Sequence, residues 1–275
     1  MRRIAAFVGL LTIIALVSAA ASSAASAATI VATHAVFGEF AEILAGDDLD
    51  VVTIIPSGFC PAQYDLSPRD LAAVLDASLI LYSGFEVWIE QLAAASDAEL
   101  LQLPGIWNTP DAAIEKVGSI RGALAARFPD LADAFSERAA TYTDRLHELG
   151  TQLLDRAAAV SSVDFSVVCM KWQAEFVGWL GFDVAVSYAP PASLTLQDLV
   201  RLTESGTAAG AELVIDNLQS GVQFGGKLAR ELDAIHVVLS NFPGAMPNSA
   251  TVIDLLERNA EALFDAVSPW DEGES

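Results

Sequence analysis

Residues 130–161 read DLADAFSERAATYTDRLHELGTQLLDRAAAVS, and the spacing of their apolar side chains predicts one long helix. These side chains recur at steps of three, four and seven residues and so share one helix face. They are Leu131, Phe135, Tyr142, Leu146, Leu149, Leu153 and Val160. Pro129 ends the preceding helix, and Gly150 is the single weak point inside the run. A helix of this length spans about 45 Å at about 1.5 Å per residue, so we expect it to connect two lobes.

Short strands and helices alternate on both sides of this helix. The patterns predict strands at Thr29–His34, Asp50–Ile55 and Ser78–Tyr82 before it, with a helix from about Glu86 to Leu101. After it they predict strands at Asp164–Cys169, Asp183–Ser187, Glu212–Asp216 and Ile235–Leu239, and a last helix at Ser249–Val267. Alternating strands and helices predict parallel sheets covered by helices. The expected fold is α/β, with two lobes, each a parallel sheet flanked by helices, joined by the long helix.

The two halves also resemble each other in sequence. Residues 66–71 read LSPRDL and residues 194–199 read LTLQDL. In each, a Ser or Thr at the start of a helix is followed three residues later by an Asp, which predicts a capping box. The similarity favours an internal duplication.

The amino terminus has the pattern of a secretory signal. Arg2 and Arg3 precede the apolar stretch Ile4–Ala20, and small residues at 25–27 offer a cleavage site. An uncleaved membrane anchor is the alternative, since the apolar stretch is nearly long enough to span a bilayer. We therefore expect an exported protein, periplasmic or at the cell surface. The expected division is a signal peptide at 1–28, an N-terminal lobe at 29–128, the linking helix at 129–162 and a C-terminal lobe with a short acidic tail at 163–275.

Composition argues against nucleic acid as a partner. The 275 residues contain 14 Lys and Arg against 36 Asp and Glu, for a formal net charge of −22. A field of this sign repels phosphate backbones.

Ligands of open parallel sheets bind beyond the carboxyl ends of the strands, so two facing lobes predict a cleft between those ends. The segments that follow the strands therefore supply the candidate site residues. They are His34, the loop 58–65, Ser83 and Gly84, residues 169–171, Asp216 and Asn217, and Ser240 with Asn241.

Several of these segments carry a family resemblance. Residues 54–58 read IIPSG, Tyr64 follows, and residues 67–71 and 77–84 read SPRDL and ASLILYSG. In this order they resemble the zinc/manganese-type solute-binding proteins of ABC importers, and with the linking helix the resemblance covers nearly all of residues 29–267. It implies an extracytoplasmic protein that captures a transition-metal ion between its lobes and delivers it to a membrane permease, with no chemical step. We expect it to act as a monomer.

The metal ligands that this resemblance implies are missing. Ala62 stands at the position of the first His, two residues before the loop tyrosine, and no His occurs around Leu103–Asp111. Met170 and Ser240 stand where the third ligand and the last carboxylate are expected. Because a Zn²⁺ site needs about four N, S or O donors, the family's usual ligand set is not present.

Softer donors occur on the same expected walls. They are Cys60, Met170, Cys169 and His34, and thiolate and thioether ligands favour Cu(I) over Mn²⁺. A soft-metal variant of the family is therefore one hypothesis. A disulfide between Cys60 and Cys169 is another, since disulfides are usual in exported proteins.

Other residues on these walls favour a small organic solute. The candidates for such a ligand are Gln63, Tyr64, Trp107, Lys171, Trp172, Asp216, Asn217, Gln219 and Ser240. A scaffold or adhesin with a degenerate site is a further alternative. The sequence contains no nucleophile elbow, zinc-protease motif or phosphate-binding loop, so we do not expect an enzyme.

Overall fold

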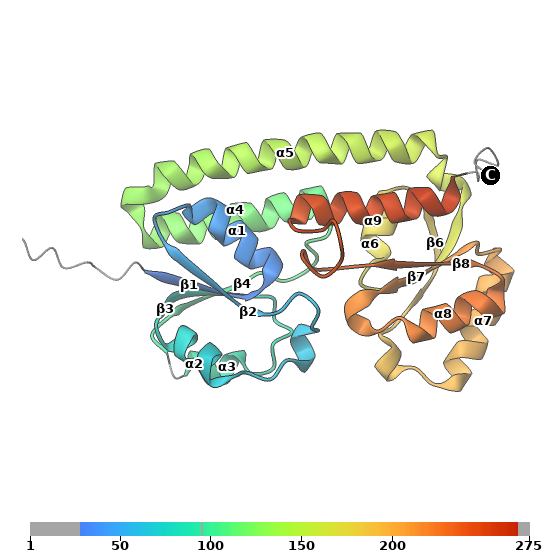
Figure 1. Ribbon diagram of the computed structural model, residues 1–275, viewed down its shortest axis with the longest axis horizontal. Helices are drawn as coiled ribbons and strands as arrows, with labels where there is room; N and C mark the ends of the chain where they lie inside the picture. Colours follow the sequence, from blue (N-terminus) through green and yellow to red (C-terminus); the bar gives the residue numbers. More distant parts are fainter. Residues whose placement is uncertain (1–27, 95, 269–275) are drawn as a thin grey trace, which may run out of the picture.

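The computed structural model describes residues 28–94 and 96–268 (Figure 1). The expected signal peptide, apart from Ala28, and the acidic tail beyond residue 268 lie outside the described residues. Among the helices that the structure describes, none is long and apolar enough to cross a membrane.

The N-terminal lobe contains a four-stranded parallel sheet in the order β2-β1-β3-β4. Its strands are β1 (Thr29–His34), β2 (Asp50–Ile55), β3 (Ala77–Tyr82) and β4 (Glu99–Gln102). The inner strand β1 is buried along nearly its whole length, as expected of a parallel strand covered on both faces.

The C-terminal lobe repeats this topology, with a parallel sheet in the order β6-β5-β7-β8. Its strands are β5 (Ser166–Met170), β6 (Asp183–Tyr188), β7 (Leu213–Asn217) and β8 (Ile235–Leu239). Two parallel-sheet lobes flanked by helices confirm the predicted fold class. The shared strand order agrees with the sequence similarity between the halves.

One face of both sheets is covered by a common layer of helices. It consists of α1 (Ala35–Ala45), α4 (Pro110–Arg127), α5 (Ala132–Ala159), α6 (Ala174–Trp179) and α9 (Val252–Val267). Figure 1 shows α5 running over both lobes with α9 beneath it. A single apolar core joins Phe37 of α1, Leu146 of α5 and Phe176 of α6, so the two lobes share packing along this layer.

The opposite face of each sheet has its own smaller core. In the N-terminal lobe it is covered by α2 (Pro68–Leu75) and α3 (Ile89–Ala93), and in the C-terminal lobe by α7 (Leu196–Ala209) and α8 (Gln223–Leu232). Both predicted capping boxes form, Ser67 with Asp70 and Thr195 with Asp198. These caps satisfy the free N–H groups at the starts of α2 and α7.

The predicted helix from Glu86 to Leu101 is wrong. The structure places only the short α3 and the edge strand β4 there. Strand β4 has just four residues, of which the two in the middle are half-buried and the two at the ends exposed. A strand this short leaves too few apolar positions for its period to be distinguished from that of a helix. The last helix begins at Val252 rather than Ser249, because Thr251 is its N-cap.

Candidate functional site

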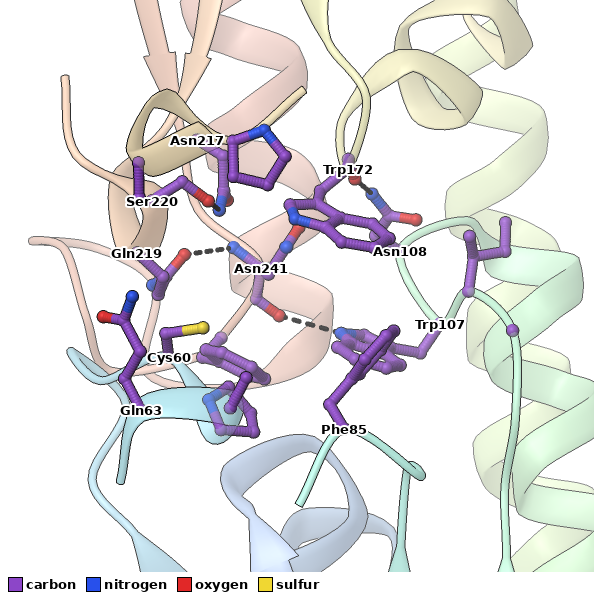
Figure 2. A pocket seen from close by; sticks show the side chains of 17 residues that line it. Cys60, Gln63, Phe85, Trp107, Asn108, Trp172, Asn217, Gln219, Ser220 and Asn241 are labelled. Carbon is purple, nitrogen blue, oxygen red and sulfur yellow. Dashed lines mark hydrogen bonds between the residues drawn. The ribbon is translucent and has the colours of Figure 1, made fainter. Parts of the chain in front are cut away.

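A pocket of about 330 Å³ lies between the two lobes (Figure 2). Its N-terminal wall comes from the short turn Pro61–Gln63 after β2 and from the loops after β3 and β4, and its C-terminal wall from the loops after β5, β6, β7 and β8. Both walls are therefore built at carboxyl ends of strands, where the topology predicts a ligand. The lining residues are Cys60, Pro61, Ala62, Gln63, Phe85, Gly105, Ile106, Trp107, Asn108, Trp172, Pro190, Ala192, Asn217, Gln219, Ser220, Asn241 and Phe242.

A network of side-chain amides supports the C-terminal wall. The fully buried Gln173 donates through Nε2 to the side-chain oxygens of Asn217, at 3.0 Å, and Asn241, at 2.8 Å. Asn217 in turn donates to the hydroxyl of Ser220 at 2.9 Å. These bonds fix the amide groups in one orientation without any charged member.

Several hydrogen bonds join the two walls. The indole N–H of Trp107 donates to the carbonyl of Asn241 at 3.0 Å, and the amide of Asn108 donates to the carbonyl of Trp172 at 3.1 Å. Gln219 donates to the carbonyl of Ser57 at 3.1 Å. The lobes are thus in direct contact around the pocket.

Aromatic rings make up much of the pocket's apolar surface. Trp107 stacks on Phe242 with 5.8 Å between ring centroids, and Phe85 meets Trp172 edge-on at 5.3 Å. Each pair joins a ring of the N-terminal lobe to a ring of the C-terminal lobe. Figure 2 shows the rings of Phe85, Trp107 and Trp172 around the same space as the side chain of Cys60.

His34 lies behind this aromatic surface rather than in the pocket. Its ring packs against Phe37, Trp107 and Phe242, with centroids 4.0, 4.7 and 5.1 Å away. Neither ring nitrogen has a hydrogen-bond partner among the described residues. Burial lowers the pKa of His34 to about 4, although the nearby charge of Glu86 opposes this shift, so the ring is neutral at pH 7.

Glu86 is the buried carboxylate beside His34. It accepts hydrogen bonds from the hydroxyl of Thr33, from the backbone and side chain of Ser83, and from the backbone N–H of Gly84. Burial disfavours its charge, but these donors outweigh burial and its pKa lies below the usual value. These hydrogen bonds within the N-terminal lobe therefore occupy the carboxylate of Glu86.

The four predicted soft-metal ligands do not come together. Only Cys60 lines the pocket; Met170 packs in the core beneath the C-terminal sheet, and Cys169 packs in the shared core on the other face. Burial, with the nearby charge of Asp216, raises the pKa of the Cys169 thiol. Both thiols are free, so the alternative, a disulfide between Cys60 and Cys169, is not formed.

The residues of the pocket do not fit a metal ion. Ala62 lines it at the position of the expected first His, and Gly105 lines it in the segment expected to carry the second. Within the described residues no group of three or more His, Cys, Asp or Glu is placed to hold a metal. None of the residues that line the pocket is charged, and Cys60 is its single soft donor.

Among the organic-solute candidates, Gln63, Trp107, Trp172, Asn217 and Gln219 line the pocket as predicted. The other predicted candidates have different roles, and each is explained by a local partner. Tyr64 donates to Asp70, and Lys171 lies over the ring of Trp172. The buried Asp216 is paired with Tyr188 and His236, and the buried Ser240 accepts a hydrogen bond from Gln219.

The sequence prediction missed Phe85, Asn108 and the supporting Gln173. Asn108 follows β4, the strand that the pattern did not reveal, so its place at a strand end was hidden. Gln173 lies just before α6, where a polar residue is also an ordinary helix-start residue.

Two α/β lobes are joined along a helical layer, and a pocket lies between the carboxyl ends of their sheets. A family model described as zinc-uptake complex component A, periplasmic, matches residues 30–266, and the chain belongs to this family. The predicted family is thereby confirmed, and this family consists of solute-binding proteins.

Curated relatives carry the names of several metals. The chain is 27% identical over 215 residues to the zinc-binding lipoprotein AdcA of Streptococcus pneumoniae serotype 4, covering 64% of this chain and 42% of the relative. It is 26% identical over 174 residues to the manganese-binding lipoprotein MntA of Halalkalibacterium halodurans, covering 56% and 58%. The chain thus spans about half the length of the curated relatives it matches.

Solved structures share the fold. A cadmium-bound periplasmic metal-binding protein of Candidatus Liberibacter asiaticus aligns with a TM-score of 0.78 at 18% identity, over 88% of this chain and all of that one. A crystal structure of ZnuA aligns with a TM-score of 0.74 at 20% identity over the same shares. At these identities the likeness extends to the fold alone.

Proposed function

We propose that this chain is the extracytoplasmic solute-binding component of an ABC importer. It captures a solute in the interlobe pocket and presents it to a permease in the membrane. The observation that carries the proposal is the pocket itself, which both lobes build from loops at the carboxyl ends of their strands.

Capture requires no chemical step. A solute that contacts both walls binds the closed arrangement of the lobes better than an open one, and binding therefore shifts the population toward the closed form. Opening would break the interlobe bonds from Trp107 to Asn241, from Asn108 to Trp172 and from Gln219 to Ser57. The core shared along α5 limits how far the lobes separate.

Family membership makes a transition-metal ion the first cargo to test. The relatives AdcA and MntA are named for zinc and manganese. In this chain the proposed soft-metal site reduces to the thiol of Cys60, because Met170, Cys169 and His34 are buried away from the pocket. A single thiolate with neutral amides falls short of the about four donors of a protein zinc site.

The importer role is tested in intact cells of the host. Cross-linking of the tagged, exported chain should recover the membrane-spanning subunit of an ABC importer, and deletion of that subunit should abolish uptake of the solute that the chain carries. Recovery of no importer subunit from cells that export the chain in quantity would overturn the proposal.

The matched variants for this test are Ala62→Trp and Ala126→Trp. Ala62 lines the pocket, whereas Ala126 lies exposed on α4 in the helical layer. The indole introduced at residue 62 should fill the pocket and block uptake, while the same ring at residue 126 should leave uptake unchanged.

A further inference from the structure

We infer that the pocket takes an uncharged organic solute with a flat apolar body, rather than a metal ion. The inference rests on the proposed capture function and names the class of cargo for the same pocket. It follows from the charge of the lining, the character of its walls and the polar groups that its internal network leaves free.

The lining offers no counter-charge to an ion. Burying an unpaired charge is strongly unfavourable, so a binding site for an ion supplies opposite charges or a full set of donors. The exposed ammonium of Lys171 lies over the ring of Trp172 outside the lining, and two buried carboxylates beside lining residues are committed elsewhere. Glu86 is held by Thr33, Ser83 and Gly84, and Asp216 is paired with Tyr188 and His236.

The walls of the pocket are suited to a flat ring. Trp107 stacks on Phe242, Phe85 meets Trp172 edge-on, and Ile106 adds further apolar surface. Aromatic walls bind planar ligands by stacking and by edge contacts. The volume of about 330 Å³ falls in the range of pockets for small organic molecules.

Three amides of the lining keep a polar atom without a partner among the described residues, and one of these atoms is the buried side-chain oxygen of Asn108, an acceptor. The side-chain oxygen of Asn241 accepts from Gln173, and within the described part of the chain its Nδ2 has no acceptor. The amide of Gln63, exposed at the rim of the pocket, makes no side-chain hydrogen bond to any described residue. Asn241 therefore offers a donor, and Gln63 both a donor and an acceptor, to a neutral polar group of the ligand.

Calorimetry with three ligands of the same indole body tests the inference. Indole-3-acetamide is neutral, indole-3-acetate is an anion and tryptamine is a cation. We expect the amide to bind at least tenfold more tightly than either charged form, a difference of about 1.4 kcal/mol or more. Zn²⁺, Mn²⁺ and Cu(I) are titrated in parallel.

Two variants test whether the ligand binds in the pocket. Ala62→Trp should abolish binding of the neutral ligand and Ala126→Trp should preserve it. A library of small uncharged aromatic compounds, screened by thermal shift on the same proteins, extends the test beyond the indole body. The expected compounds stabilise the wild-type chain and Ala126→Trp but not Ala62→Trp.

Three results would overturn the inference: equal affinity for the charged ligands, binding of a metal ion that Ala62→Trp removes, or no stabilisation by any uncharged compound. Binding of a metal in the pocket would leave the importer role intact. Failure of the importer role would instead be seen in the cross-linking experiment, which does not depend on the nature of the cargo.

Discussion

The carboxylate of Glu39 on α1 accepts a hydrogen bond from the hydroxyl of Tyr142 on α5, with 3.0 Å between the oxygens. Its other oxygen accepts from the backbone N–H of Val252, the first residue of α9, at 2.7 Å. One side chain thus joins the N-terminal lobe, the linking helix and the helix that follows the last strand of the C-terminal lobe.

This position makes Glu39 a source of pH-dependent stability. Burial raises its pKa from 4.5 to about 7, the bonds from Val252 and Tyr142 oppose the shift, and the charges of Asp254 and Glu42 add to it. Between pH 4.5 and about 7, Glu39 keeps its proton in the folded state and has lost it in the unfolded state. The contribution of Glu39 to the free energy of unfolding therefore falls as pH rises. We expect a change on the order of 1–3 kcal/mol across this interval.

Urea unfolding of the wild-type chain and of Glu39→Gln, at pH values from 4.5 to about 7, measures this contribution. Glutamine keeps one acceptor and does not titrate, so the stability of the variant relative to wild type should increase with pH. A constant difference between the two proteins would show that Glu39 titrates normally.

Gly150→Ala tests the single weak point predicted in the linking helix. The helix α5 runs through Gly150 without a break. A Cβ there would meet Pro110 at 3.4 Å and Trp179 at 3.8 Å, which is ordinary contact. We expect the alanine to stabilise the protein by about 0.5–1 kcal/mol through helix propensity.

Gly122→Ala is the matched control, because Gly122 lies in α4 and the added carbon would have no atom within 4 Å beyond its chain neighbours and the backbone of its own helix. Thermal or urea unfolding should give similar gains for both variants. Destabilisation by Gly150→Ala alone would mean that the contact of α5 with Pro110 and Trp179 has no room for a methyl group.

Sequence patterns predicted the framework better than the site. Strands β1 and β2 have the predicted bounds, and the apolar face of 130–161 is the buried face of α5, because burial and periodicity are properties of one segment. The direction of a side chain at a strand end depends on the whole lobe. Both faces of a parallel sheet are covered, so Cys169 and Met170 are buried on opposite faces although they end the strand that leads to the pocket.

The two cysteines should differ sharply in reactivity. Cys60 is half-buried at the pocket, whereas Cys169 is fully buried and burial raises its pKa. Because the thiolate is the reactive form, we expect iodoacetamide to label one thiol in the native protein and two after denaturation without reductant. Mass spectrometry counts the labels.

Cys60→Ser should remove the native label and leave one label after denaturation. Absence of any label in the unreduced, denatured wild-type chain would reveal a disulfide between Cys60 and Cys169 and would contradict the arrangement described above.

The contribution of His34 to the free energy of unfolding should change with pH in the direction opposite to that of Glu39. Its pKa is lowered from 6.5 to about 4, chiefly by burial, so below 6.5 the unfolded state takes up a proton that the folded state does not. The contribution of His34 is therefore lost as pH falls from 6.5 to about 4, on the order of 1–3 kcal/mol. The pH ranges over which His34 and Glu39 change stability overlap. Their opposite effects therefore partly cancel in the wild-type chain.

His34→Leu removes the titration and the two unpartnered ring nitrogens while keeping an apolar side chain of similar size. A buried polar group without a partner costs about 1–3 kcal/mol, so the variant should be at least as stable as wild type near pH 7 and should gain relative to it as pH falls. It should also bind the neutral indole ligand as wild type does, because His34 does not line the pocket. A variant that loses binding while remaining folded would show that His34 reaches the solute, contrary to its place behind Trp107 and Phe242.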